Sequence, residues 1–87
     1  MAYVYILQCA DGSLYTGWTS DLERRFKQHQ SGNGSKYVRS RLPVVLVYSK
    51  KYSTSQARKQ EVKIKALTRS QKLKLVEKAQ LKNRGSL

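Results

Sequence analysis

The sequence contains one cysteine, Cys9, and one histidine, His29, among its 87 residues. A single cysteine excludes an internal disulfide, and one cysteine with one histidine cannot supply the usual four ligands of a structural zinc site. This composition fits a reducing compartment, and we expect the protein to be cytoplasmic. No apolar run approaches the length needed to cross a bilayer, so no membrane attachment is expected.

Acidic residues are also scarce, since five Asp and Glu stand against eighteen Lys and Arg, for a formal net charge of +13. Such self-repulsion is tolerated mainly when a polyanion is the usual partner. Nucleic acid is therefore the leading candidate partner. An anionic membrane surface is the competing partner, but the basic residues are spread over every segment and no segment shows a broad Trp, Phe and Leu face for insertion.

The length permits one domain with one modest core. We expect this domain to span residues 1–81 and residues 82–87 to form a frayed tail. No internal repeat, low-complexity tract or interdomain linker interrupts the chain.

The first half of the sequence predicts a β-hairpin followed by a helix. Residues 3–9 are β-branched, aromatic or apolar, Asp11-Gly12 supplies turn chemistry, and residues 14–17 resume an extended pattern. Ser20 with Glu23 predicts a capping box, and the helix should end before Gly32. One stripe of this helix carries Leu22, Arg25, Phe26 and His29.

The second half predicts a strand and two helices. A basic connection over residues 35–41 leads to the apolar run 44–48, whose β-branching favours a buried strand, the central or third of the sheet. Capping signals at Ser53 with Gln56 and at Thr68 with Gln71 predict helices ending at about Leu67 and Leu81. The expected fold is α/β, of the α+β kind: a small three-stranded sheet flanked by helices, in the order strand, strand, helix, strand, helix, helix.

Two tyrosines and an arginine follow one another at intervals of ten residues, and they carry a family resemblance. Tyr3-Val4-Tyr5 resembles the GIY element and Leu14-Tyr15-Thr16-Gly17 resembles the YIG element of the GIY-YIG endonuclease family. Arg25, His29 and Glu61 fall where that family places its arginine, its helix histidine or aromatic residue, and its metal-binding glutamate. The resemblance covers nearly the whole chain and is closest to the compact stand-alone members.

The resemblance implies a divalent-metal-dependent endonuclease that hydrolyses phosphodiester bonds, with DNA favoured over RNA and structured DNA as the expected substrate. It gives Tyr5 the role of activating water, with Tyr15 hydrogen-bonding in the same site and His29 orienting a tyrosine or sharing in proton transfer. Arg25 would stabilise the transition-state charge. One weakly held Mg²⁺ or Mn²⁺ would be bound by Glu61, with waters and the substrate phosphate completing its shell.

The shortage of carboxylates supports Glu61 independently of the family. Asp11 has a turn to form, Asp21 lies in a first helical turn and Glu23 belongs to a capping box, which leaves Glu61 and Glu77. Glu61 borders an apolar arc of Ala57, Ile64 and Leu67 and can point towards the sheet. The competing interpretation is a surface glutamate paired with Lys65, worth a few tenths of a kcal/mol.

The register of the predicted hairpin decides whether Tyr5 and Tyr15 can share one site. A two-residue loop at Asp11-Gly12 would place Tyr15 on the opposite sheet face from Tyr5, whereas a three-residue loop would pair Cys9 with Tyr15 and put both tyrosines on one face. The catalytic interpretation therefore requires an odd-length loop or a bulge.

Other residues have weaker assignments. Taken alone, a strand tyrosine such as Tyr5 or Tyr15 more often serves only to pack the strand. A single histidine such as His29 is more often a polar residue at the boundary of the core. For Arg25, a packed aliphatic stem with an exposed guanidinium is as good an explanation as a catalytic role. Cys9 is best explained as a small buried hydrophobe. We expect nucleic-acid contacts of low sequence specificity from Lys27, Lys36, Arg39, Arg41, Lys50 and Lys51, with Trp18 either stacking on a base or covering the core edge.

Three functions remain open at this point. The first is the endonuclease, and the second is a non-catalytic basic module that binds DNA or RNA and retains the nuclease fold. The third is a structural protein of a ribonucleoprotein particle, which explains the charge but gives no reason for the tyrosines, the arginine and the glutamate. A larger protein partner could supply selectivity, because so small a domain has a small binding face.

Overall fold

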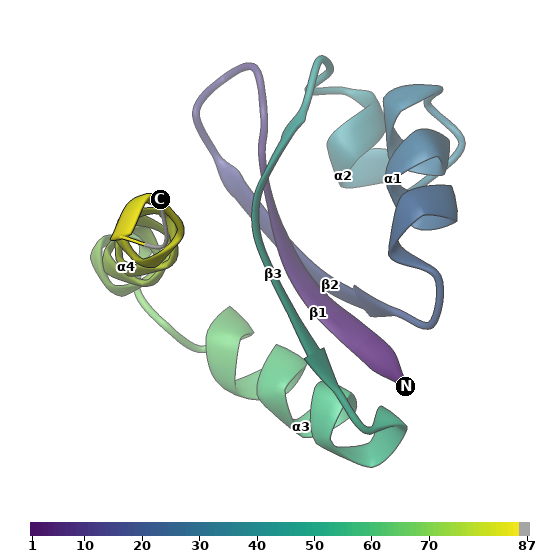
Figure 1. The fold of residues 1–87 in the computed structure, drawn as a ribbon. Coiled ribbons are helices and arrows are strands. Elements are labelled where there is room, and N and C mark those ends of the chain that lie inside the picture. The colour runs from purple at the N-terminus through teal and green to yellow at the C-terminus, as the bar shows by residue number, and fades with distance from the viewer. Residues whose placement is uncertain (86–87) are drawn as a thin grey trace.

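The computed structural model describes residues 1–85, with side chains placed for residues 1–80 (Figure 1). It has three strands and four helices in the expected α+β order, with one short helix added. They are β1 (Ala2–Gln8), β2 (Leu14–Thr19), α1 (Leu22–Gln30), α2 (Lys36–Arg39), β3 (Val45–Tyr52), α3 (Thr54–Lys65) and α4 (Arg69–Gly85). Helix α4 continues past the predicted end at Leu81, and the last part of the predicted frayed tail, 86–87, lies outside the described residues.

The sheet is antiparallel with strand order β2-β1-β3, so β1 is its central strand. The apolar run 44–48 does form the third strand of the chain, but the prediction that it is a buried or central strand was wrong. It lies at the edge of the sheet, Val45 is 61% exposed, and the strand continues through the exposed Lys50 and Lys51. An edge strand pairs on one side only, so part of an apolar run can remain in solvent.

Two small cores form because alternate residues of β1 point to opposite faces of the sheet. On one face, Val4 and Ile6 pack with Ala57 and Ile64 of α3 and Val76 of α4. On the other face, Tyr5, Leu7 and Cys9 pack with Val38 of α2 and Val44. Figure 1 shows the resulting layers, with α1 and α2 on one side of the sheet and α3 and α4 on the other. Cys9 is a buried free thiol, as expected.

The hairpin register confirms the prediction that the loop has an odd number of residues. The connection spans the five residues 9–13, and Tyr5 pairs with Gly17, which puts Tyr5 and Tyr15 on the same face. The predicted partner was wrong in detail, because Tyr15 pairs with Leu7 rather than Cys9. Asp11 closes the turn by accepting hydrogen bonds from the backbone N–H and hydroxyl of Ser13, at 3.0 and 2.6 Å.

The helix starts confirm two of the three predicted caps. Ser53 caps α3, and Thr68 and Gln71 bond each other's backbone N–H groups at the start of α4. The capping box predicted for Ser20 and Glu23 does not form. Asp21 caps α1 by accepting from the N–H of Arg24 at 3.1 Å, because the Thr19 hydroxyl accepts from the Asp21 N–H and delays the start of the helix by one residue.

Candidate active site

Three predicted catalytic side chains from three different elements meet on the α1 face of the sheet. Tyr5 comes from the central strand, Tyr15 from β2 and His29 from the last turn of α1. The Tyr5 hydroxyl and His29 Nε2 form a buried hydrogen bond of 2.9 Å. The Tyr15 ring lies edge-on to His29 with centroids 5.3 Å apart, and the two tyrosine rings are 6.5 Å apart. The fold therefore assembles this part of the predicted constellation.

Gly17 makes room for the Tyr5 phenol on the neighbouring strand. A β-carbon built on Gly17 would lie 2.6 Å from the Tyr5 hydroxyl oxygen and 2.8 Å from its Cζ. Such contacts are well inside van der Waals separation, so any larger residue would displace the ring. The glycine of the YIG-like element thus has a steric role, since it lets a tyrosine from the GIY-like element lie across β2.

His29 is held in place by a second glycine. A β-carbon on Gly34 would lie within 2.9 Å of Cγ and Cε1 of the His29 ring, and closer still to Nδ1. The loop after α1 therefore packs its backbone directly against the imidazole. His29 is fully buried, and its Nδ1 has no hydrogen-bond partner within the described part of the chain. The stripe Leu22, Phe26 and His29 does face this core, as the helix pattern predicted.

The surroundings keep both hydrogen-bonding groups uncharged at neutral pH. Burial, assisted by the positive charge of Arg25, lowers the pKa of His29 to about 4. Burial also raises the pKa of the Tyr5 phenol, and Tyr15 and Glu61 raise it further, whereas Arg25 lowers it. A neutral imidazole with its proton on Nδ1 can accept the hydrogen bond of the neutral Tyr5 phenol through Nε2, which fixes the orientation of both side chains.

Arg25 lies beside this pair on α1 and is half-buried. Its guanidinium acts on the pKa of both Tyr5 and His29, and Nη1 donates to the side-chain oxygen of Gln28 at 3.3 Å. Arg25 and Gln28 also line a hollow of about 370 Å³ with Trp18 at the junction of β2 and α1. A planar cation at the wall of an open hollow is suited to bind a phosphate there.

Glu61 lies on α3, which packs on the other face of the sheet. Its charge raises the pKa of Tyr5, and α3 packs against β2 as well as β1. Glu61 does pair with Lys65 at 3.7 Å, as the competing interpretation supposed, but its side chain is only 18% exposed. Glu23, the comparable glutamate of α1, pairs with Lys27 at 3.4 Å and is 82% exposed. Glu61 is therefore not an ordinary surface glutamate.

Glu61 offers a single, partly shielded carboxylate as a possible metal ligand. Within residues 1–85, no group of three or more His, Cys, Asp or Glu side chains comes together. A closed transition-metal site is therefore not formed by these side chains, whereas Mg²⁺ commonly keeps several waters and takes one or two carboxylates. The residues present fit that second kind of site.

The residues predicted to contact nucleic acid fall into two groups. Lys36 and Arg39 are exposed on α2, as are Lys50 and Lys51 on β3. The other three have intramolecular partners: Trp18 packs against the α3-face core, Lys27 pairs with Glu23, and Arg41 bonds Asp11.

Tyr37 is the residue that sequence reasoning missed. Its ring stacks on Tyr15 with centroids 5.9 Å apart and an interplanar angle of 28°, so it extends the aromatic cluster to the surface. The segment was predicted to be a basic connection, but it contains α2, which presents Tyr37 towards β2. The signal available was the spacing of Tyr37 and Arg41, four residues apart and so one helical turn.

Comparisons with known proteins agree with this geometry. Residues 1–74 match the family model of the GIY-YIG catalytic domain. A UPF0213 protein of Clostridium perfringens is 52% identical over 83 residues, covering 94% of this chain and 89% of that protein. One from Staphylococcus haemolyticus is 50% identical over 76 residues, covering 86% of this chain and 93% of that protein.

Two solved structures are similar as well. The solution NMR structure of a UPF0213 protein from Bacillus halodurans has 48% identity and a TM-score of 0.58, covering 88% of this chain and 84% of that one. A second NMR structure, of a protein from E. faecalis, has 43% identity and a TM-score of 0.61, covering 91% of this chain and 85% of that one. The family model supports a nuclease-type function. The chain therefore belongs to the GIY-YIG family and, within it, to the UPF0213 proteins.

Proposed function

We propose that this protein is a metal-dependent endonuclease that hydrolyses phosphodiester bonds in DNA, with one Mg²⁺ or Mn²⁺ held at Glu61. The buried 2.9 Å hydrogen bond between Tyr5 and His29 carries the proposal, with Arg25 beside it and a partly shielded Glu61 on α3 whose charge also acts on the Tyr5 phenol. Packing a fold does not require these groups, whereas phosphoryl chemistry uses a base, a cation and a metal ligand together.

Tyr5 takes the proton of the attacking water in this mechanism. The 2.9 Å hydrogen bond to His29 Nε2, in the tautomer where Nδ1 carries the imidazole proton, orients the phenol for this role. The low pKa of His29 keeps that nitrogen free to accept the hydrogen bond at neutral pH. Burial raises the pKa of Tyr5, and the positive charge of Arg25 opposes this by favouring the phenolate, which is the form that can take a proton.

Arg25 stabilises the negative charge that develops on the phosphate oxygens. Its planar guanidinium can donate two parallel N–H hydrogen bonds to a phosphate, which the ammonium of lysine cannot do. A hydrogen bond from Nη1 to Gln28 already orients it. A divalent ion bound at Glu61 would add Lewis-acid stabilisation of the same charge and lower the pKa of water. Glu61 is partly shielded from solvent, which strengthens its attraction for such an ion.

The family resemblance favours DNA over RNA, and structured or single-stranded DNA over plain duplex. The charge of +13 supplies affinity for any nucleic acid and gives little sequence preference. We therefore assign the choice of substrate to the shape of the nucleic acid, with a larger protein partner as a second source of selectivity. Within the described residues no helix is long and apolar enough to span a membrane.

Cleavage by the purified wild-type protein tests this proposal. Labelled single-stranded, duplex and branched DNA, and RNA of matching sequence, are incubated with Mg²⁺, Mn²⁺ or EDTA and resolved on a denaturing gel. We expect DNA cleavage with either metal and none in EDTA. Salt-sensitive binding without cleavage of any substrate would instead support the non-catalytic binding module.

A further inference from the structure

The aromatic cluster of the active site reaches solvent through Tyr37. This residue is 38% exposed although its ring stacks on Tyr15. Tyr15 in turn lies against His29, the partner of the Tyr5 hydroxyl. A continuous row of rings therefore leads from the groups proposed to react to the surface beside α2.

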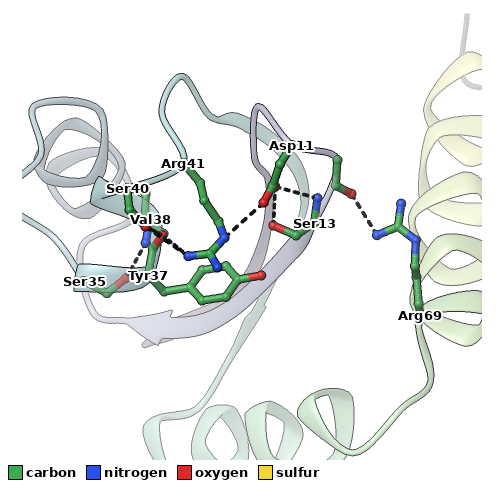
Figure 2. Close-up of polar contacts among 9 residues, drawn as sticks. Asp11, Ser13, Ser35, Tyr37, Val38, Ser40, Arg41 and Arg69 are labelled. Atoms are coloured by element: carbon green, nitrogen blue, oxygen red, sulfur yellow. Dashed lines mark hydrogen bonds and ion pairs between the residues drawn. The ribbon is translucent and has the colours of Figure 1, made fainter.

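Arg41 covers the Tyr37 ring as a fixed plane (Figure 2). Its guanidinium carbon lies 3.8 Å from the ring centroid. Nε donates to Asp11 Oδ2 at 3.1 Å, and Nη1 donates to the carbonyl of Tyr37 and the hydroxyl of Ser40, both at 3.0 Å. These three hydrogen bonds hold the guanidinium over the Tyr37 ring.

The hairpin tip that anchors Arg41 is itself held from the other side. Asp11 is fixed by Ser13, and the carbonyl of Gly12 accepts a hydrogen bond of 2.8 Å from Arg69 of α4 (Figure 2). The stack of Tyr15, Tyr37 and Arg41 is thus organised before any ligand binds, which lowers the entropy lost on binding.

We propose that the Arg41 guanidinium, backed by the Tyr37 ring, forms a stacking platform for an unpaired nucleobase of a nucleotide adjoining the scissile phosphate. This inference rests on the proposed function and names the substrate feature that the site selects. Unstacked bases bind well to aromatic rings and arginine planes, whereas a base inside a duplex has both faces covered. Lys36 and Arg39 are exposed on the same short helix and supply charge for the adjoining backbone.

A binding measurement in EDTA tests the platform without any cleavage step. Fluorescence anisotropy compares labelled oligothymidylate with an abasic strand of the same length, which carries the same charge but no bases. We expect the wild type to bind oligothymidylate on the order of ten-fold more tightly. The preference should largely disappear in Tyr37→Leu and in Arg41→Lys, and persist in Tyr37→Phe, which keeps the ring.

Arg58→Lys is the matched control, because it makes the same substitution at an exposed arginine of α3, on the other side of the sheet from the stack. It should retain the base preference. A preference that survives in both Tyr37→Leu and Arg41→Lys, each shown by circular dichroism to be folded, would overturn the platform. A wild type that shows the preference and cleaves nothing with Mg²⁺ or Mn²⁺ would overturn the proposed function and leave the platform supported.

Discussion

Glu61→Gln is expected to lower the rate of metal-dependent cleavage by about a thousand-fold or more while leaving nucleic-acid binding intact. The substitution keeps the shape of the side chain but removes the negative charge that would hold the ion, and losing such an ion forfeits several kcal/mol of transition-state stabilisation. Binding should not weaken, because the net charge of +13 rises by one. Single-turnover cleavage and anisotropy binding on the same DNA measure the two effects.

Glu77→Gln provides the control, since it makes the identical chemical change at an exposed position on α4. We expect this variant to cleave at the wild-type rate. If both variants lose the same fraction of the cleavage rate, or if Glu61→Gln cleaves at the wild-type rate, Glu61 does not hold the catalytic ion.

Arg25→Lys is expected to slow cleavage by about a hundred- to a thousand-fold, again with little effect on affinity. Lysine retains the charge but not the planar fork, and its ammonium cannot hold both Gln28 and a phosphate in the arginine geometry. Because the interaction forms mainly as charge develops in the transition state, the loss should fall on the rate constant at saturating DNA.

Arg58 offers a matched comparison, because it is an exposed arginine of α3 and does not line the hollow beside Arg25. Arg58→Lys should cleave within a small factor of the wild type. If Arg25→Lys instead weakens binding and leaves the saturated rate unchanged, Arg25 is a ground-state phosphate contact and not a transition-state stabiliser.

Much of the site could be predicted because the relevant sequence signals are local or have a fixed period. The two-residue alternation of a strand, combined with an odd-length loop, is sufficient to place Tyr5 and Tyr15 on one face. The helix period likewise places His29 inward and Glu61 at the border of the apolar arc of α3. The sequence could therefore indicate which side chains converge without giving any distance between them.

The features that were missed have one local cause and two that depend on contacts distant in the chain. The wrong N-cap of α1 follows from the Thr19 hydroxyl, which competes locally for the Asp21 N–H. The edge position of β3 depends on which strand pairs with both neighbours, and an apolar run of five residues does not carry that information. Arg41 looked like a free phosphate ligand because its partner Asp11 lies thirty residues earlier in the chain.

In the proposed function, Glu61 on one face of the sheet and Tyr5 with Arg25 on the other form one metal-dependent centre. NMR titration of the isotope-labelled protein with Mn²⁺ tests it most directly, because the paramagnetic ion broadens the resonances nearest to it. We expect broadening to begin at Glu61 and at Gly17, over which the Tyr5 hydroxyl lies, and to disappear in Glu61→Gln. Broadening centred on Asp11 or Glu23, with Glu61 and Gly17 unaffected, would contradict it.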